Sequence, residues 1–94
     1  MADPDFSAIG VRIERWPRAL TRAGKVLIRD GRLELLTSGD REIDSAPLRA
    51  VRAVRTWPAR RGGAVARING RRYRLRLPAT RFVEAVQRAR AAPH

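Results

Sequence analysis

The chain has 94 residues, with 21 Lys or Arg against 9 Asp or Glu, no cysteine and a formal net charge of +12. A chain this short holds one compact core, so an active site between two domains and a disulfide-stapled fold are both excluded. Hydrophobic residues make up 44% of the sequence, which is ordinary for a globular domain. No apolar run approaches the ~20 residues that span a bilayer, and the chain does not start as a basic signal peptide, so we expect a cytoplasmic protein.

The basic side chains gather in the second half of the chain. Residues 1–48 contain 8 basic and 8 acidic residues, whereas residues 49–94 contain 13 basic residues and one acidic residue, Glu84, which gives 13 − 1 = +12. Twenty of the 21 basic residues are Arg, a bias that a GC-rich genome also produces. Position along the chain is therefore more informative than the preference for Arg.

The first predicted strand covers residues 9–13, where apolar and polar residues alternate. Residues 1–8 mix acidic, small and proline positions, and we expect them to form a flexible lead-in. Trp16-Pro17 ends the strand, because proline donates no ladder hydrogen bond. Residues 18–23 fit a helical turn or a loop.

A β-hairpin is predicted at Asp30-Gly31, which separates the apolar runs at residues 25–29 and 32–36. Both positions of a two-residue type I′ turn need positive φ, and Asp-Gly is a favoured pair there. The turn fixes the register, so alternate residues of the two strands share one face. That face carries Val26, Ile28, Leu33 and Leu35.

The middle of the chain predicts a turn at residues 37–40 and a short strand at residues 41–44. Residues 46–48, with proline in their centre, break that strand. Apolar residues then recur every three positions from Leu48, which fits a helical turn that leads into a strand ending at Trp57-Pro58.

A second hairpin is predicted around Asn69-Gly70, with strands at residues 64–68 and 71–77. The same register places Ala64, Ala66, Ile68, Tyr73, Leu75 and Leu77 on the core face. The opposite face carries Val65 together with Arg67, Arg72, Arg74 and Arg76. The adjoining turns add Arg60, Arg61 and Arg71. These seven Arg residues are the predicted site for an anion or an acidic partner.

An amphipathic helix is predicted at the end of the chain. Pro78 ends the last strand, Thr80 is a good N-cap, and apolar residues recur at helical spacing from Phe82. Residues 92–94 are expected to fray. Seven short strands joined by tight turns and followed by one helix predict a mainly β (α+β) fold, a bent antiparallel sheet or open barrel capped by that helix.

Four features of the sequence occur in a characteristic order. They are the hairpin of residues 24–36, the spacing of Ile43, Leu48 and Val51, the strand Tyr73-Arg74-Leu75, and a closing helix that begins Thr80-Arg81-Phe82-Val83. Together they resemble the bacterial pleckstrin-homology-like (PH-like) and GRAM-like domains. The resemblance covers residues 9–91, which we expect to form a single domain, and it implies a non-enzymatic interaction or adaptor role.

The resemblance also bears on lipid binding. Eukaryotic lipid-binding members grip inositol phosphates with basic residues around a roomy loop between their first two strands. If the Asp30-Gly31 hairpin is that connection, its loop is too short for such a site.

No catalytic residue, metal site or cofactor is predicted. The only His is His94 and Cys is absent, so zinc ligation and histidine or cysteine catalysis are excluded. Asp40, Glu42 and Asp44 alternate along one predicted strand, but a solvated acidic edge explains them more simply than a divalent cation does, because the spacing of a calcium-binding loop is missing. We therefore expect a non-enzyme.

The Arg-rich face has two interpretations. Outward strand positions are ordinarily solvated, and Arg there also discourages edge-to-edge pairing. Clustered guanidinium groups nevertheless repel one another, so a fold that places them on one face either leaves them solvated or binds an anion there.

If the face binds, the predicted partner is an acidic protein segment or an anionic membrane surface, where the protein would be peripheral. Nucleic acid is the alternative partner. It would be held only by non-specific phosphate contacts, because Tyr73, the one aromatic residue of the basic hairpin, faces inward and cannot stack on a base. A homo-oligomer is a further route, in which the acidic strand around Glu42 and Asp44 meets the Arg face of another copy.

Overall fold

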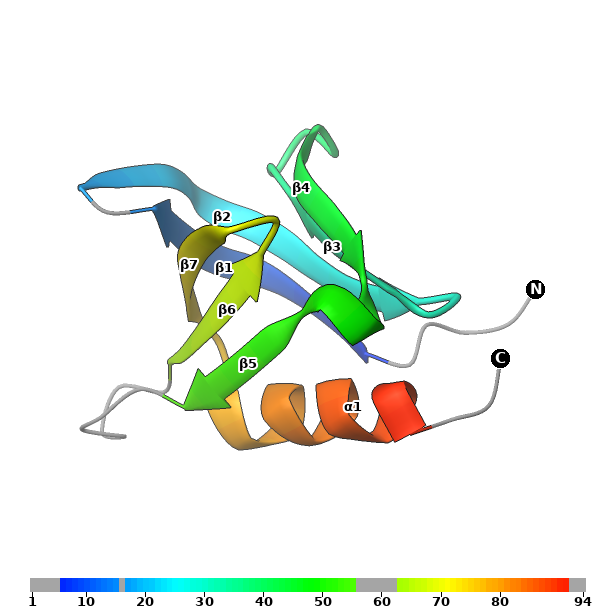
Figure 1. Cartoon of the computed structure of the whole chain (residues 1–94). Helices are drawn as coiled ribbons and strands as arrows, with labels where there is room; N and C mark the ends of the chain where they lie inside the picture. Colours follow the sequence, from blue (N-terminus) through cyan, green and yellow to red (C-terminus); the bar gives the residue numbers. More distant parts are fainter. Residues whose placement is uncertain (1–5, 16, 56–62, 92–94) are drawn as a thin grey trace.

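The computed structural model describes residues 6–15, 17–55 and 63–91. Within these residues seven strands form one antiparallel sheet, and one α-helix follows them (Figure 1). The elements are β1 (Phe6–Arg15), β2 (Arg18–Arg29), β3 (Arg32–Leu36), β4 (Glu42–Pro47), the 3-10 turn η1 (Leu48–Ala50), β5 (Arg52–Arg55), β6 (Ala64–Ile68), β7 (Arg71–Arg76) and α1 (Ala79–Ala91). The predicted bent antiparallel sheet with a closing C-terminal helix is confirmed.

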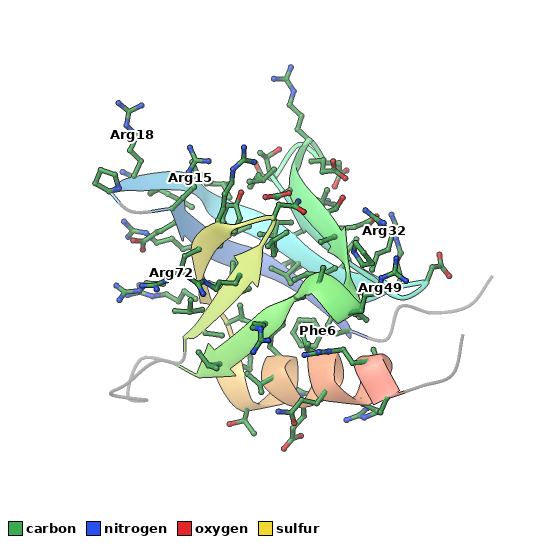
Figure 2. The ribbon with its side chains drawn as sticks, in the orientation of Figure 1. Phe6, Arg15, Arg18, Arg32, Arg49 and Arg72 are labelled. Carbon is green, nitrogen blue, oxygen red and sulfur yellow. The ribbon has the colours of Figure 1, made fainter. Side chains whose placement is uncertain are left out.

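The strand order across the sheet is β4-β3-β2-β1-β7-β6-β5, so β1 joins the β2–β4 half to the β5–β7 half. The sheet bends around one apolar core, and α1 lies along its open side (Figure 1). Phe82 of α1 meets Phe6 of β1 edge to face, with ring centroids 5.5 Å apart, and Figure 2 shows Phe6 between the sheet and the helix. The helix therefore closes the core that the bent sheet leaves open.

Both predicted hairpins form with the predicted register. Asp30 and Gly31 have φ of 52° and 73°, and Asn69 and Gly70 have φ of 54° and 76°. Ile28 pairs with Leu33 in the first hairpin, and the second hairpin keeps the same two-residue geometry. The residues expected to face the core are buried, namely Val26, Ile28, Leu33, Leu35, Ala64, Ala66, Ile68, Tyr73, Leu75 and Leu77.

β1 and β2 form a long hairpin that the sequence does not predict. β1 begins at Phe6, so residues 6–8 belong to a strand and not to the flexible lead-in expected over residues 1–8. The prediction of a helical turn or loop at residues 18–23 is wrong, because β2 begins at Arg18 and pairs with β1 from its first residue. This end of the hairpin lies mostly outside the core, so the sequence there has no alternation of apolar and polar residues to indicate a strand.

β4 departs from the prediction in its length and in its faces. It continues to Pro47 instead of breaking at residues 46–48, which an edge strand permits because one side of its backbone has no ladder to complete. A bulge lies between the pairs Leu35 with Asp44 and Leu36 with Glu42. The two acidic residues therefore face opposite sides of the sheet, with Glu42 exposed and Asp44 buried.

The helix begins one residue earlier than predicted. α1 starts at Ala79, so Thr80 is its second residue and not its N-cap, and the amide of Phe82 donates to the carbonyl of Pro78 at 3.1 Å. The apolar side packs as predicted, with Phe82, Val86 and Ala89 buried. No helix within the described ranges has the length and apolarity to cross a bilayer.

Candidate partner-binding face

Four of the predicted Arg residues lie on the outer side of β6 and β7. Cross-strand pairing sets Arg67 directly opposite Arg72, and Arg74 and Arg76 follow at two-residue steps along β7. Side chains at two-residue steps project from the same face of a strand, so all four point away from the core. All four are exposed, and Figure 2 shows Arg72 directed outward.

Two further Arg residues join this group from neighbouring strands. Arg52 on β5 pairs with Arg67, and Arg12 on β1 pairs with Arg76. We call the outer surface formed by these side chains the Arg face; its members are Arg12, Arg52, Arg67, Arg72, Arg74 and Arg76. Arg12 joins the face through the pairing of β1 with β7, which are distant in the sequence, and Arg52 joins it through the pairing of the consecutive strands β5 and β6. Neither pairing has a two-residue turn that would indicate its register in the sequence.

Cross-strand pairing arranges the side chains of this surface in rows, and the rows differ in charge. Arg52, Arg67 and Arg72 form one row across three strands. The next row consists of Val54, Val65, Arg74 and Glu14. Val54 is 60% exposed although it is apolar, and the sequence pattern had grouped it with the buried residues Leu48 and Val51. The face is therefore a charged surface with an apolar part near β5.

Within the described residues, the Arg face is poorly neutralised. Arg12 Nε lies 3.0 Å from Glu14 Oε1, an ion pair that lacks the alignment of a hydrogen bond. The other five Arg residues make no ion pair with a described carboxylate. Guanidinium groups bind carboxylates and phosphates through parallel N–H donors, so this arrangement suits an oxyanion-bearing partner.

The remaining predicted site residues lie elsewhere. Arg71 pairs with Ile68 and so falls on the opposite side of β7 from the Arg face, where its Nη1 lies 3.7 Å from Asp44 Oδ2. Arg60 and Arg61 lie outside the residues that the structure describes.

Asp44 is the centre of a buried polar cluster. Its Oδ2 accepts a 2.7 Å hydrogen bond from the Tyr73 hydroxyl, and its Oδ1 accepts from Asn69 Nδ2 at 2.7 Å and from the Ser45 amide at 2.9 Å. Burial raises the pKa of Tyr73 above its usual 10.0, and the hydrogen bond to the Asp44 carboxylate raises it further. The cluster ties β4 to the β6–β7 hairpin, so its role is structural.

This cluster overturns the interpretation of residues 40–44 as a solvated acidic edge. Asp44 is turned inward, while Asp40 is in the preceding turn, where it pairs with Lys25. Among the described residues no group of three or more metal-ligand side chains comes together. Of the two carboxylates expected to meet another copy, Glu42 is exposed, whereas Asp44 is buried and not available.

The Asp30-Gly31 hairpin is not the connection between the first two strands. β1 ends at Arg15 and β2 begins at Arg18, so residues 16 and 17 join them, whereas Asp30-Gly31 joins β2 to β3. A two-residue connection offers no roomy loop for an inositol phosphate.

Exposed Arg residues also lie outside the Arg face. Figure 2 shows Arg15 and Arg18 at the end of the β1–β2 hairpin, and Arg32 and Arg49 on the other side of the molecule. Arg32 donates to the Ser45 hydroxyl at 3.2 Å. Of these four residues only Arg49 belongs to residues 49–94, so the excess charge of that half is not confined to the Arg face. On the Arg face, Arg residues lie directly opposite one another on neighbouring strands.

Comparison with known proteins supports the fold. No protein-family model and no curated protein matches the sequence. The chain is similar to a solved structure titled "Vav1 inhibited by an allosteric inhibitor: Vav1 inhibitors block GEF activity" (TM-score 0.68, 13% identity, 94% of this chain and 18% of that chain). It is also similar to the apo structure of the activated truncation of Vav1 (0.68, 12%, 92% and 26%). A third similar structure holds the tandem PX-PH domains of Bem3 from Saccharomyces cerevisiae (0.61, 16%, 95% and 42%).

These likenesses define the class of fold. Seven antiparallel strands in one bent sheet, closed by a C-terminal helix, form a PH-like fold. The chain spans less than half the length of each of these proteins, and at 12 to 16% identity the likeness concerns the fold alone.

Proposed function

We propose that this protein is a non-enzymatic interaction module that docks an acidic protein segment on the Arg face. The observation that carries the proposal is the cross-strand register of Arg52, Arg67 and Arg72, with Arg74 beside them. None of these four residues makes an ion pair with a described carboxylate. Two positive charges about 6 Å apart repel by roughly 0.7 kcal/mol in water, so the face is stable in solvent yet gains from an anionic partner. A cytoplasmic location and a bacterial PH-like or GRAM-like origin belong to the same proposal.

The composition of the face favours a protein partner. Val54 and Val65 form an apolar part of the face that charged side chains border on two sides, and a mixture of apolar and charged residues is usual in a protein interface. Single-stranded nucleic acid also needs aromatic stacking platforms, and Tyr73, the aromatic residue of this hairpin, is buried.

The proposal is tested with three ligands. Fluorescence anisotropy measures binding of a labelled poly-glutamate peptide and of a labelled DNA duplex, and co-sedimentation measures binding to anionic vesicles. The first variant replaces four residues of the face by Gln, namely Arg67, Arg72, Arg74 and Arg76. Its control removes the same charge from exposed positions elsewhere, namely Arg22, Arg49, Arg81 and Arg88. We expect the face variant to bind the peptide at least about tenfold more weakly and the control to stay within about threefold of wild type.

Two outcomes would contradict the proposal. Equal weakening by both variants would mean that net charge, and not the arrangement of the face, drives peptide binding. Tighter binding of the duplex or the vesicles than of the peptide at physiological salt would assign the face to nucleic acid or to a membrane.

A further inference from the structure

The Arg face ends in an exposed apolar pair next to the edge of the sheet. Val54 on the edge strand β5 lies directly opposite Val65 on β6. Val54 is 60% exposed and Val65 is half-buried. The Arg composition of the chain does not explain an apolar pair at these positions. The cross-strand contact of the two valines supports the sheet, yet Val54 still leaves most of its apolar surface in water, where an apolar side chain of a partner would cover it.

Charged side chains border this pair on two sides. Outward residues of one strand repeat every ~6.8 Å and neighbouring strands lie ~4.8 Å apart, so one row of the face is within reach of the next. Along the strands, Arg52 precedes Val54 and Arg67 follows Val65, while across the sheet Arg74 is the direct partner of Val65. Each of these three is a cation without a described ion-pair partner.

The nearest carboxylate of the face lies on the far side of Arg74. Glu14 pairs with Arg74 across the β1–β7 ladder, and its carboxylate contacts Arg12. The surroundings of the valine pair are therefore positive and apolar together. Such a surface complements a segment in which carboxylates flank an apolar side chain, and it leaves a purely polar polyanion with unfilled apolar contacts.

We infer that the binding site extends onto β5 and that its occupant is an acidic protein segment that seats an apolar side chain on Val54 and Val65 while its carboxylates meet Arg52, Arg67 and Arg74. The inference rests on the proposed function, since it specifies the partner of the same face. It assigns Arg52, Val54 and Val65 a role in partner recognition.

The test uses two labelled poly-glutamate peptides of equal length and charge, one with a central pair of Leu residues and one with a central pair of Ser residues. We expect wild-type protein to bind the Leu peptide roughly tenfold more tightly, because the leucines remove apolar area from water at the valine pair. The double variant Val54→Thr and Val65→Thr keeps the shape, charge and β-branching of both positions. It should lose most of the preference for Leu while binding the Ser peptide as wild type does.

Two controls keep the result specific. Ile9→Ser removes another exposed apolar side chain, 77% exposed on β1, and should leave the preference unchanged. Arg52→Gln should weaken both peptides, whereas Arg49→Gln, an equal change of charge next to the site in sequence, should weaken neither.

Three results overturn the inference, and they separate it from the proposed function. Equal affinity of wild type for the two peptides, or a preference that survives the double Thr variant, would overturn this inference alone. Failure of wild type to bind either peptide would overturn the proposed function and this inference with it.

Discussion

Asp44 joins two parts of the sheet that are far apart in the sequence. Its carboxylate accepts hydrogen bonds from Asn69 and Tyr73 of the second hairpin, and Arg71 lies close enough to offset its charge. A buried carboxylate with several donors stabilises a fold only when all of its partners are present. The strength of this cluster can therefore be tested by removing its central residue.

Replacing Asp44 by Ala should lower the free energy of unfolding by about 3 kcal/mol, because the variant leaves the buried Tyr73 hydroxyl without its acceptor and removes an acceptor of the Asn69 side chain and of the Ser45 amide. Urea unfolding followed by circular dichroism measures this change. Asp40→Ala is the matched control, since it removes an exposed carboxylate that pairs with Lys25, and it should cost less than about 1 kcal/mol. A loss below about 1 kcal/mol for Asp44→Ala would show that the cluster is not stabilising.

Tyr73 predicts a loss of stability at high pH. Its folded-state pKa lies above the ordinary value of 10.0, so the folded protein keeps the hydroxyl proton after the unfolded chain has lost it. The stabilisation is therefore complete below about pH 10 and declines as the pH rises from there through the folded-state pKa. We expect the stability difference between wild type and Tyr73→Phe to be constant up to about pH 9 and to shrink above pH 10.

The chain has a single tyrosine, so ultraviolet absorbance of tyrosinate reports this group directly. In native protein the tyrosinate band should develop at a higher pH than in urea-unfolded protein. Equal midpoints in the two states would contradict the raised pKa.

At this scale the sequence predicts the direction of most side chains but fails for Asp44. The predicted site also includes Arg71, although the predicted register, which the structure confirms, pairs Arg71 with the core residue Ile68. The four outward Arg residues of the second hairpin follow from its turn, because a two-residue loop fixes the register. The inward position of Asp44 depends on a bulge in β4, and one extra residue reverses every face that follows it.

At the scale of elements, the long β1–β2 hairpin depends on the close approach of β2 to its neighbours at Gly24. A Cβ at this position would lie 2.6 Å from the Leu36 carbonyl oxygen and 2.9 Å from Ile13 Cδ1. Only glycine fits there, because a backbone oxygen held in a ladder cannot move aside cheaply. This contact allows β2 to coil across β1 through several register shifts.

Gly24→Ala should therefore destabilise the protein by about 2 kcal/mol, since a side chain at this position overpacks the sheet. Gly39→Ala provides the comparison, because its Cβ would meet nothing closer than 3.9 Å. Thermal unfolding of the two variants should show a clear loss of Tm for the first and a small change for the second. Similar Tm values for both variants would mean that β2 relaxes around the added methyl group.

Some strands can be predicted from the residues next to them in the sequence, and others cannot. Asp30-Gly31 and Asn69-Gly70 predict their hairpins because turn and strands are adjacent in the sequence. The extension of β2 over residues 18–23 is fixed by pairing with β1 and not by its own apolar pattern, so the sequence there indicates only a helical turn or a loop.

At the scale of the whole molecule, the uneven distribution of charge along the chain only partly describes its surface. The second half of the chain carries the net charge of +12, yet the structure directs Arg49, Arg71 and the helix residues away from the Arg face. It also brings Arg12 onto that face from the half with no net charge. Which basic residues share a surface depends on the pairing of β1 with β7 and of β5 with β6, and neither pairing has a short turn to fix it.

The central claim is that an acidic protein segment docks on the Arg face, and mapping the contact on the labelled protein tests it most directly. Nuclear magnetic resonance records the backbone amide chemical shifts while the Leu-containing poly-glutamate peptide is added at physiological salt. We predict that the largest shifts fall on β5, β6 and β7, at Arg52, Val65, Arg67, Arg72 and Arg74. Shifts confined to α1 or to the end of the β1–β2 hairpin, or no shifts at all, would contradict the claim.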